Sequence, residues 1–241
     1  MVETPQKPRT EGVILAAGLS TRSGRYKMTL PLGDKTVIQR SVENMYDAVD
    51  RIWVVVGWQA EQVRAMLAPY AKVECVPNED FRQGMFSSVK TGLARASAPR
   101  VFLQPGDCAL ISPAVYARML LADGDIVIPT YGSKKGHPVL FQGSVIPEIL
   151  ALPDDAILRD YIQAMGFATI EVQDEGILLD IDTPEDYKAI RARYRPHGQG
   201  GRDDQAGLFP VDGGGAPRLL PNLAPRSDGT AVCPAVHCGV K

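Results

Sequence analysis

The chain has 241 residues, of which 45% are apolar and 22% are charged, and its formal net charge is −2. This composition is typical of a globular protein with enough apolar residues for a large core, and a charge so close to zero gives no electrostatic basis for binding nucleic acid or a membrane. No apolar run reaches the ~18 residues of a membrane-spanning helix, and the start of the chain lacks the apolar segment of a secretory leader. We therefore expect a cytoplasmic protein without nucleic-acid or membrane partners.

The first predicted element is a buried strand formed by the apolar run from Val13 to Ala17. Gly18 follows and lets the chain turn sharply. The next nine positions hold small hydroxyl residues, a second glycine and three cations, completing the stretch "GVILAAGLSTRSGRYK" from Gly12 to Lys27. Backbone N–H groups and cations at the end of a buried strand suit an anion with several oxygens, and a polyphosphate is the obvious candidate.

Strand and helix patterns then alternate along the chain. In order, they predict a helix over 36–49, a strand over 51–57, a helix over 59–67, a strand over 72–78, a helix over 84–96, a strand over 100–107, a helix opened by Ser112 and Pro113, a strand over 125–132 and a loop over 133–138. Repeated units of this kind predict an α/β fold, with a single doubly wound, mostly parallel sheet covered by helices on both faces.

Composition divides the chain into three parts. We expect a flexible N-terminus over 1–10, one domain over 11–195 and a disordered or loosely docked tail over 196–241, which is rich in Gly and Pro. Cys233, His237 and Cys238 lie in this tail, but three ligands, two of them adjacent, do not match the usual spacing of a zinc site. Cys75 and Cys108 lie far apart and give no indication of a disulfide framework.

The glycine-containing loop after the first strand matches neither of two common phosphate-binding motifs. A Walker A loop requires Gly-Lys before a hydroxyl residue, whereas Gly24 is followed by Arg25. A dinucleotide fingerprint requires a glycine where Ser20 stands. The pattern that remains, A-A-G-x-S-x-R-x-G-x-x-K, resembles the signature of the molybdenum cofactor cytidylyltransferases and their guanylyltransferase relatives, which charge a phosphorylated small molecule with a nucleotide.

Later segments resemble the same family, so that the likeness extends from about Glu11 to Tyr194. They are "QGMFSSVKTGL" from Gln83, "LQPGDCALIS" from Leu103, "GHPVLF" from Gly136 and "DIDTPEDY" from Asp180. The sequence departs from the family at two places: Ser23 stands where Met or Phe is common, and Ala109 stands where a proline is usual. Neither departure removes a charged group, so we expect both to alter shape rather than chemistry.

The loop chemistry and the resemblance together predict a nucleotide site. Loop N–H groups and the forked guanidinium of Arg22 suit the β- and γ-phosphates, and the compact charge of Lys27 suits the α-phosphate or the incoming phosphate. The resemblance places the segment around Ser87 and Ser88 against the base and sugar, although these serines could simply open a helix. The full predicted nucleotide set is Leu15, Ala16, Ala17, Gly18, Ser20, Thr21, Arg22, Lys27, Gly84, Ser87, Ser88 and Gly106.

Mg²⁺ is the expected cofactor, because nucleotidyl transfer brings two polyanions together and Mg²⁺ is held by one or two carboxylates plus phosphate oxygens. We assign Asp107 and Asp182 as its ligands, with Arg22, Lys27 and Asp107 as the catalytic set. Asp107 could instead cap the turn after its strand. Asp180 and Asp182 lie two apart in an expected short strand and so share a face, which leaves Asp180 as an alternative ligand.

Two further features complete the predicted site. Thr183 and Pro184 have the pattern of an N-cap and first residue of a helix. The resemblance places the loop of Gly136, His137 and Pro138 beside the acceptor, although His137 could be only a loop residue with a fixed backbone.

The predicted function is therefore Mg²⁺-dependent transfer of CMP from CTP to a phosphorylated acceptor, with molybdopterin as the family's acceptor and pyrophosphate as the product. A transient contact with the enzyme that receives the cofactor is also expected. Ala17 favours the cytidylyl branch, because the guanylyl branch more often has a second glycine there. The alternatives are guanylyl transfer, a sugar-phosphate or choline-phosphate nucleotidyltransferase, and a non-catalytic carrier of the charged cofactor.

Overall fold

The computed structural model describes residues 9–19 and 26–195 of the chain. The predictions that concern Ser20, Thr21 and Arg22, the departure at Ser23, and the tail from residue 196 all lie outside the described residues. They therefore stay predictions. Cys75 and Cys108 are free thiols, as expected from their spacing.

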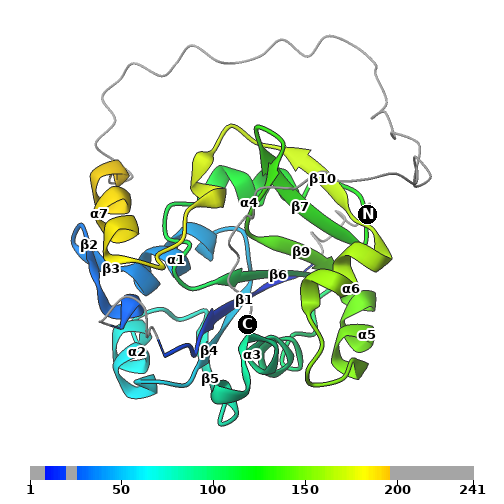
Figure 1. The fold of residues 1–241 in the computed structure, drawn as a ribbon, viewed down its shortest axis with the longest axis horizontal. Coiled ribbons are helices and arrows are strands. Elements are labelled where there is room, and N and C mark those ends of the chain that lie inside the picture. The colour runs from blue at the N-terminus through cyan, green and yellow to red at the C-terminus, as the bar shows by residue number, and fades with distance from the viewer. Residues whose placement is uncertain (1–8, 20–25, 196–241) are drawn as a thin grey trace, which may run out of the picture. The chain divides into compact units, whose positions relative to one another are not determined.

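A central sheet of eight strands organises the domain (Figure 1). Its order is β10-β7-β9-β6-β1-β4-β5, with the short β8 paired to β7. The strands span Thr10–Ala16 (β1), Arg51–Val56 (β4), Val73–Pro77 (β5), Arg100–Pro105 (β6), Ile126–Tyr131 (β7), Lys134–Lys135 (β8), Val139–Gln142 (β9) and Ala168–Glu171 (β10).

The sheet is mixed but mostly parallel. Strand β1 pairs in parallel with β4 and β6, β4 with β5, and β7 with β10, whereas β9 runs antiparallel between β6 and β7. The register aligns Ala16 of β1 with Val56 of β4, and Leu15 with Pro105 of β6. The carboxyl ends of β1, β4 and β6 therefore meet at one edge, the position at which open α/β sheets bind ligands.

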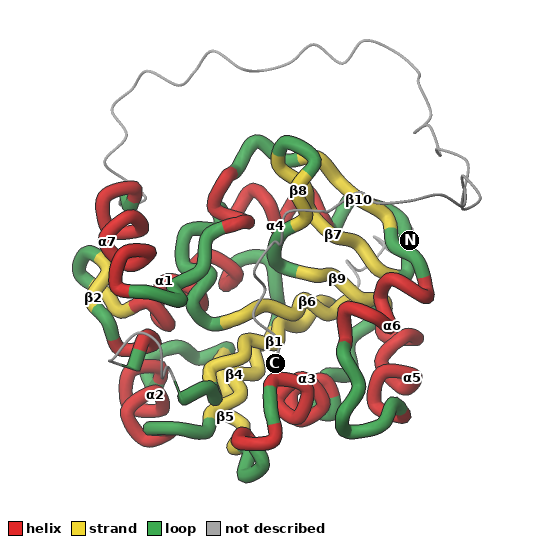
Figure 2. Tube along the Cα trace, in the orientation of Figure 1, coloured by secondary structure: helices red, strands yellow, loops and turns green. Residues whose placement is uncertain are grey.

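Helices cover both faces of this sheet, which confirms the predicted doubly wound fold (Figures 1 and 2). Alternate residues of β1 point to opposite faces, Ile14 into one apolar cluster and Val13 into the other. The Ile14 side is covered by α1 (Val37–Tyr46), α2 (Ala60–Leu67) and α4 (Pro113–Met119), and the Val13 side by α3 (Met85–Leu93), α5 (Ile146–Ala151) and α6 (Leu158–Met165).

The last helix, α7 (Pro184–Arg193), packs on a small two-stranded sheet rather than on the central one. That sheet consists of β2 (Pro31–Leu32) and β3 (Lys35–Thr36). Leu32 and Ile190 belong to the shared apolar cluster, and the Tyr187 hydroxyl donates to the Pro31 carbonyl at 2.5 Å. Four short 3₁₀ helices join the elements: η1 (Lys27–Thr29), η2 (Phe81–Gln83), η3 (Gly143–Val145) and η4 (Glu175–Leu178).

Both predicted helix caps are confirmed. The Ser112 hydroxyl accepts from the Ala114 N–H with Pro113 as the first helical residue, and the Thr183 hydroxyl accepts from the Asp186 N–H at the start of α7.

Two other expectations from the sequence, both about secondary structure, are wrong. Residues 133–138 are not all loop, because Gly132 and Ser133 adopt positive φ values and return the chain as β8.

The expected short strand around Asp180 and Asp182 does not form. The Ile181 N–H donates to the carboxylate of Asp107 at 3.3 Å instead of to a neighbouring strand. A side chain of the predicted site thus holds this segment. Within the described ranges, no helix combines the length and the apolar character needed to cross a membrane.

Candidate active site

The site lies at the shared carboxyl edge of β1, β4 and β6. Ala17 and Gly18 follow β1, and Gly106 and Asp107 follow β6. The Gly106 N–H donates to the Leu15 carbonyl at 2.8 Å, so the two strand ends remain tied beyond their ladder. A Cβ at Gly106 would lie 3.1 Å from that carbonyl and 2.8 Å from Met28 Sδ. Gly106 is therefore needed for close packing, which places Asp107 directly beside the end of β1.

Lys27 and Asp107 meet at this edge although 80 residues separate them in sequence. The Lys27 ammonium donates to Asp107 Oδ2, donates to the Ile181 carbonyl at 3.0 Å and lies 3.6 Å from Asp182 Oδ1. Asp107 is only 2% exposed. The structure thus brings together three residues that the sequence predicted for the catalytic and metal sites.

Asp180 completes an acidic cluster with Asp107 and Asp182. One carboxylate oxygen from each of the three lies within 4.8 Å of the others. Burial, reinforced by the negative charges of Asp107 and Asp182, raises the pKa of Asp180 to about 6. Burial by itself would lower the pKa of Lys27, but the three carboxylates outweigh it, so that its pKa is raised and the ammonium stays charged.

This set of donors fits a divalent metal of the Mg²⁺ type. Three carboxylate oxygens at mutual distances within 4.8 Å supply the hard ligands that Mg²⁺ and Mn²⁺ prefer. Asp180 belongs to the cluster as much as Asp182 does, so the geometry keeps open the alternative ligand considered from the sequence.

Asp186 is a site residue that sequence analysis missed. Its carboxylate accepts the Thr183 N–H at 2.8 Å and the Asp182 N–H at 3.2 Å, while its own N–H donates to the Thr183 hydroxyl. This is a capping box, and its spacing of three residues from Thr183 was visible in the sequence. The box fixes the backbone of Asp182, which makes Asp186 a positioning residue.

Tyr26 is a second residue that the sequence did not reveal. Its hydroxyl donates to the Ala16 carbonyl at 2.6 Å, and the ring is 6% exposed. Burial raises the pKa of this phenol well above its ordinary value, so the hydroxyl keeps its proton. Tyr26, which directly precedes Lys27, thus ties the chain to the end of β1. No pattern in the sequence predicted this contact.

Gly18, after β1, and Gly84, before α3, differ in backbone conformation. Gly84 has φ 116°, a conformation that side chains rarely allow, and it precedes the first turn of α3. Gly18 does not adopt such a φ, and among the described residues no atom lies within 4 Å of the Cβ it would carry. The backbone conformation therefore requires glycine at position 84, whereas neither φ nor a described neighbour requires it at position 18.

The two predicted serines of α3 are held by Asn78, which follows β5. The Asn78 amide donates to both Ser87 Oγ and Ser88 Oγ at 3.0 Å. Ser88 is buried, whereas Ser87 is partly exposed and also donates to the Gly84 carbonyl at 2.8 Å. Ser87 is thus the more accessible of the two, and Asn78 is a further positioning residue without a clear sequence pattern.

The loop of Gly136, His137 and Pro138 is fixed against η4, which leads to the acidic cluster. The His137 N–H donates to the Ile177 carbonyl at 2.9 Å, and a Cβ at Gly136 would lie 2.3 Å from that same oxygen. The His137–Pro138 bond is cis. Burial lowers the pKa of His137, and the charge of Asp107 opposes this only in part, so the imidazole is neutral at pH 7.

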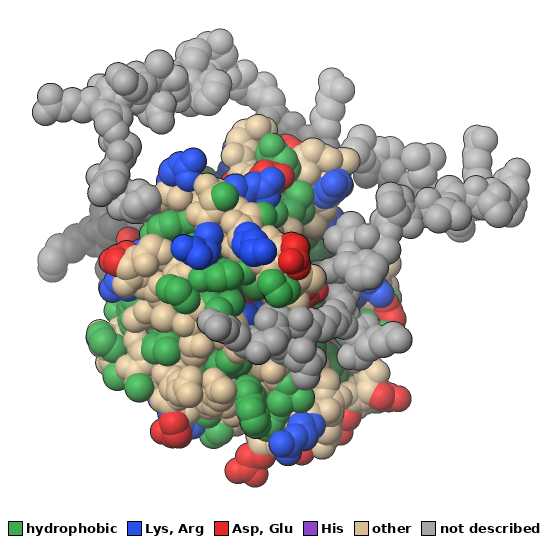
Figure 3. Space-filling view, turned by 60° about the vertical axis from the view of Figure 1, so that its left-hand side comes forward, with side chains coloured by type: hydrophobic (Ala, Val, Ile, Leu, Met, Phe, Trp, Pro, Cys, Tyr) green, Lys and Arg blue, Asp and Glu red, His purple; other side chains and the backbone are tan. Residues whose placement is uncertain are grey.

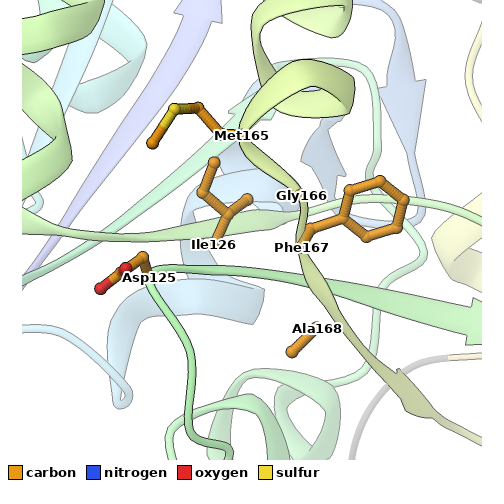
Figure 4. Close-up of a pocket in the computed structure, with 6 residues that line it drawn as sticks. All are labelled: Asp125, Ile126, Met165, Gly166, Phe167 and Ala168. Atoms are coloured by element: carbon orange, nitrogen blue, oxygen red, sulfur yellow. The ribbon is translucent and has the colours of Figure 1, made fainter. Parts of the chain in front are cut away.

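A surface hollow elsewhere is unrelated to this site. Figure 4 shows it between Asp125, Ile126 and the segment from Met165 to Ala168. These residues lie at the end of α6 and at the starts of β7 and β10, whereas the site lies where β1, β4 and β6 end. The face in Figure 3 carries both cationic and acidic side chains, in keeping with the near-neutral net charge.

A family model described as "MobA-like NTP transferase domain" matches residues 12–170, which include most of β1, the Lys27–Asp107 pair and the α3 serines. The chain belongs to this family. It is therefore a member of a nucleotidyltransferase family.

Relatives extend the similarity to most of the domain. The molybdenum cofactor cytidylyltransferase of Escherichia coli K12 is 27% identical over 183 residues, which cover 76% of this chain and 95% of that protein. A probable molybdenum cofactor guanylyltransferase of Carboxydothermus hydrogenoformans is 26% identical over 190 residues, covering 73% and 92%. Rv0371C of Mycobacterium tuberculosis H37Rv, solved in complex with manganese, superposes with a TM-score of 0.65 at 27% identity, covering 77% of this chain and all of that one.

Proposed function

We propose that this protein transfers CMP from CTP to a phosphorylated acceptor of the molybdopterin type and releases pyrophosphate. The observation that carries the proposal is the convergence of the Lys27 ammonium and the carboxylates of Asp107, Asp180 and Asp182 beside the loop that follows β1. The name of the Escherichia coli relative supports the choice of nucleotide and acceptor.

The proposed reaction needs positioning and charge neutralisation rather than a strong base. An oxygen of the acceptor phosphate, already an anion, forms a bond to the α-phosphorus of CTP. The bond between that phosphorus and the oxygen bridging to the β-phosphate breaks, and pyrophosphate leaves with the electron pair. No proton has to be removed from the attacking oxygen, which agrees with a site built from acids and a lysine.

Each part of the site has a role in this proposal. The backbone from Leu15 to Gly18, with Ser20, Thr21 and Arg22, binds the triphosphate, because N–H groups and a guanidinium match phosphate oxygens. Lys27 stabilises charge at the α-phosphate in the transition state. Gly84, Ser87, Ser88 and Gly106 border the nucleoside, and Gly136, His137 and Pro138 shape the acceptor side.

Mg²⁺ is the cofactor we propose, held by Asp107 and Asp182 with Asp180 beside them. When bound, it would supply a Lewis acid that offsets the negative charge of the triphosphate. The protein's own contribution is to hold these carboxylates ready: Ile181 N–H and Lys27 orient Asp107, and the capping box of Asp186 orients Asp182.

Guanylyl transfer is the second candidate, because the Carboxydothermus relative with that name is nearly as similar as the cytidylyl one. Ala17, directly after β1, favours CTP. The test is pyrophosphate release with CTP, GTP, UTP and ATP in the presence of Mg²⁺ and a panel of phosphorylated acceptors, including molybdopterin. CTP with molybdopterin should give the fastest release. Faster release with GTP would replace the cytidylyl assignment, and nucleotide binding without any release would favour a carrier.

A further inference from the structure

Lys27 occupies the centre of the acidic cluster in a way that the proposed transfer chemistry does not require. Its ammonium donates to Asp107 Oδ2 and to the Ile181 carbonyl, and it lies 3.6 Å from Asp182 Oδ1. The Lys27 side chain is only 20% exposed. The lysine is therefore packed into the cluster.

The cluster requires a positive charge when no other cation is there. Three carboxylates with oxygens within 4.8 Å of one another repel strongly, and Asp107 is almost fully buried. An uncompensated charge in such a place is strongly destabilising, whereas a paired and hydrogen-bonded one is tolerated. Lys27 supplies this compensation from within the chain.

The same ammonium opposes the binding of a metal ion to the cluster. A divalent cation on the cluster would use carboxylate oxygens to which Lys27 now donates, and it would be repelled by an ammonium a few ångströms away. A triphosphate changes this balance, because its oxygens give the ammonium a new partner.

We propose that Lys27 is the resident counter-ion of the Asp107, Asp180 and Asp182 cluster, and that it keeps metal affinity low until a nucleotide draws the ammonium away. The inference rests on the proposed function, since it takes the cluster as the metal site. It makes Lys27 a device that couples metal binding to nucleotide binding, beyond its role at the α-phosphate.

The first test measures Mn²⁺ binding to the full chain without nucleotide, by electron paramagnetic resonance of the free ion. Lys27→Met removes the charge and keeps a side chain of similar length. It should bind Mn²⁺ more tightly than the wild type, within the ~5–150-fold range typical of coupling between sites. Lys35→Met is the matched control, because Lys35 pairs with Glu43 outside the cluster and its loss changes the net charge equally. Equal or weaker Mn²⁺ binding by Lys27→Met overturns the inference.

A second test uses the wild-type protein and does not depend on the folding of a variant. Saturating Mn²⁺ should free the ammonium from the cluster, so acylation of Lys27 by an amine reagent, followed by mass spectrometry, should become several-fold faster. Lys35 serves as the internal reference in the same sample. Unchanged Lys27 reactivity in saturating Mn²⁺ overturns the inference.

The two tests separate this inference from the proposed function. If the wild type transfers nucleotide but binds Mn²⁺ no more weakly than Lys27→Met does, the counter-ion role is removed and the proposed function stays in place. Absence of Mn²⁺ binding in both proteins, with or without CTP, removes the metal site of the proposed function and the inference with it.

Discussion

Two buried carboxylates, Glu11 and Asp107, lie toward opposite ends of the parallel strands, and they differ in the charges and hydrogen-bond donors that surround them. Glu11, on β1, is 5% exposed and accepts at 3.0 Å from the Trp53 indole N–H and from the Ser97 N–H. Asp107, after β6, is 2% exposed and has two further carboxylates beside it. The first is surrounded by donors, and the second shares one ammonium with its neighbours.

The difference separates a carboxylate that stabilises the fold from one kept for chemistry. Two N–H donors and the Arg9 guanidinium, 3.7 Å from Glu11 Oε1, compensate Glu11 in the folded protein, so its burial fixes β1 against β4 and the segment before β6. Crowded like charges around Asp107 contribute little to folding and make sense where a cation will bind. Substitutions should therefore affect activity at one edge and stability at the other.

The largest effect is expected from Asp107→Asn. The change keeps the size of the side chain and removes one negative charge from the cluster, which weakens a site for a hard cation. Pyrophosphate release should fall ~10²-fold or more, the scale of transition-state charge stabilisation. The thermal midpoint without metal should change little, because the lost ion pair with Lys27 is offset by less repulsion among the acids.

Asp182→Asn and Asp180→Asn should reduce activity for the same reason but to different extents. Asp182→Asn should also lose activity steeply, with partial recovery at high Mg²⁺ or with Mn²⁺, whereas Asp180→Asn should be milder. An inactive Asp180→Asn beside a normal Asp107→Asn would show that the metal ligands are assigned to the wrong acids. Normal turnover in all three variants would show that the acidic cluster is not the metal site of the reaction.

Arg22→Ala extends the comparison to the loop after β1, where Arg22 lies outside the described residues. Loss of one donor to the triphosphate should reduce turnover by ~10²-fold while the circular dichroism spectrum stays the same. Loss of Arg22, like loss of the Asp107 charge, would then reduce turnover without affecting the fold. A variant with full turnover would exclude Arg22 from the proposed mechanism.

Glu11→Ala should show the reverse pattern. It leaves the Trp53 and Ser97 N–H groups buried without their acceptor, which costs about 1–3 kcal/mol for such a group. Urea unfolding should show this loss, while turnover per folded molecule at 25 °C remains close to wild type. Unchanged stability together with lost turnover would mean that the two carboxylates do not divide the tasks in this way.

Deletion of residues 196–241 is expected to have the smallest effect. The tail lacks the apolar periodicity needed to join a core, so neither the thermal midpoint nor the affinity for CTP should change appreciably. Differential scanning calorimetry and a nucleotide titration measure both. A large fall in the midpoint would show that the domain extends beyond residue 195.

Local patterns in the sequence were sufficient to predict β1, β4, β5, β6 and β7 and the helices α1 to α4, but not the elements from β9 to β10. Apolar runs gave β4 and β6 within two residues at each end and β1 within three, and the Ser112 and Thr183 caps were visible because capping chemistry acts over three or four residues. Neither β9 nor its antiparallel direction was predicted, since its apolar run Val139–Phe141 is short and has the same pattern in either direction.

For the site, the sequence by itself determined which residue types were available: a loop rich in N–H groups, a lysine after it, and acids at Asp107, Asp180 and Asp182. Only the tertiary structure decided that Lys27 lies among all three acids, that Asp107 holds the segment of Ile181 in place of a strand, and that Tyr26, Asn78 and Asp186 support the site. These contacts join segments up to 154 residues apart. Their geometry depends on how the sheet and helices pack. The periodicity of one segment contains no information about how far its residues lie in space from residues of another segment.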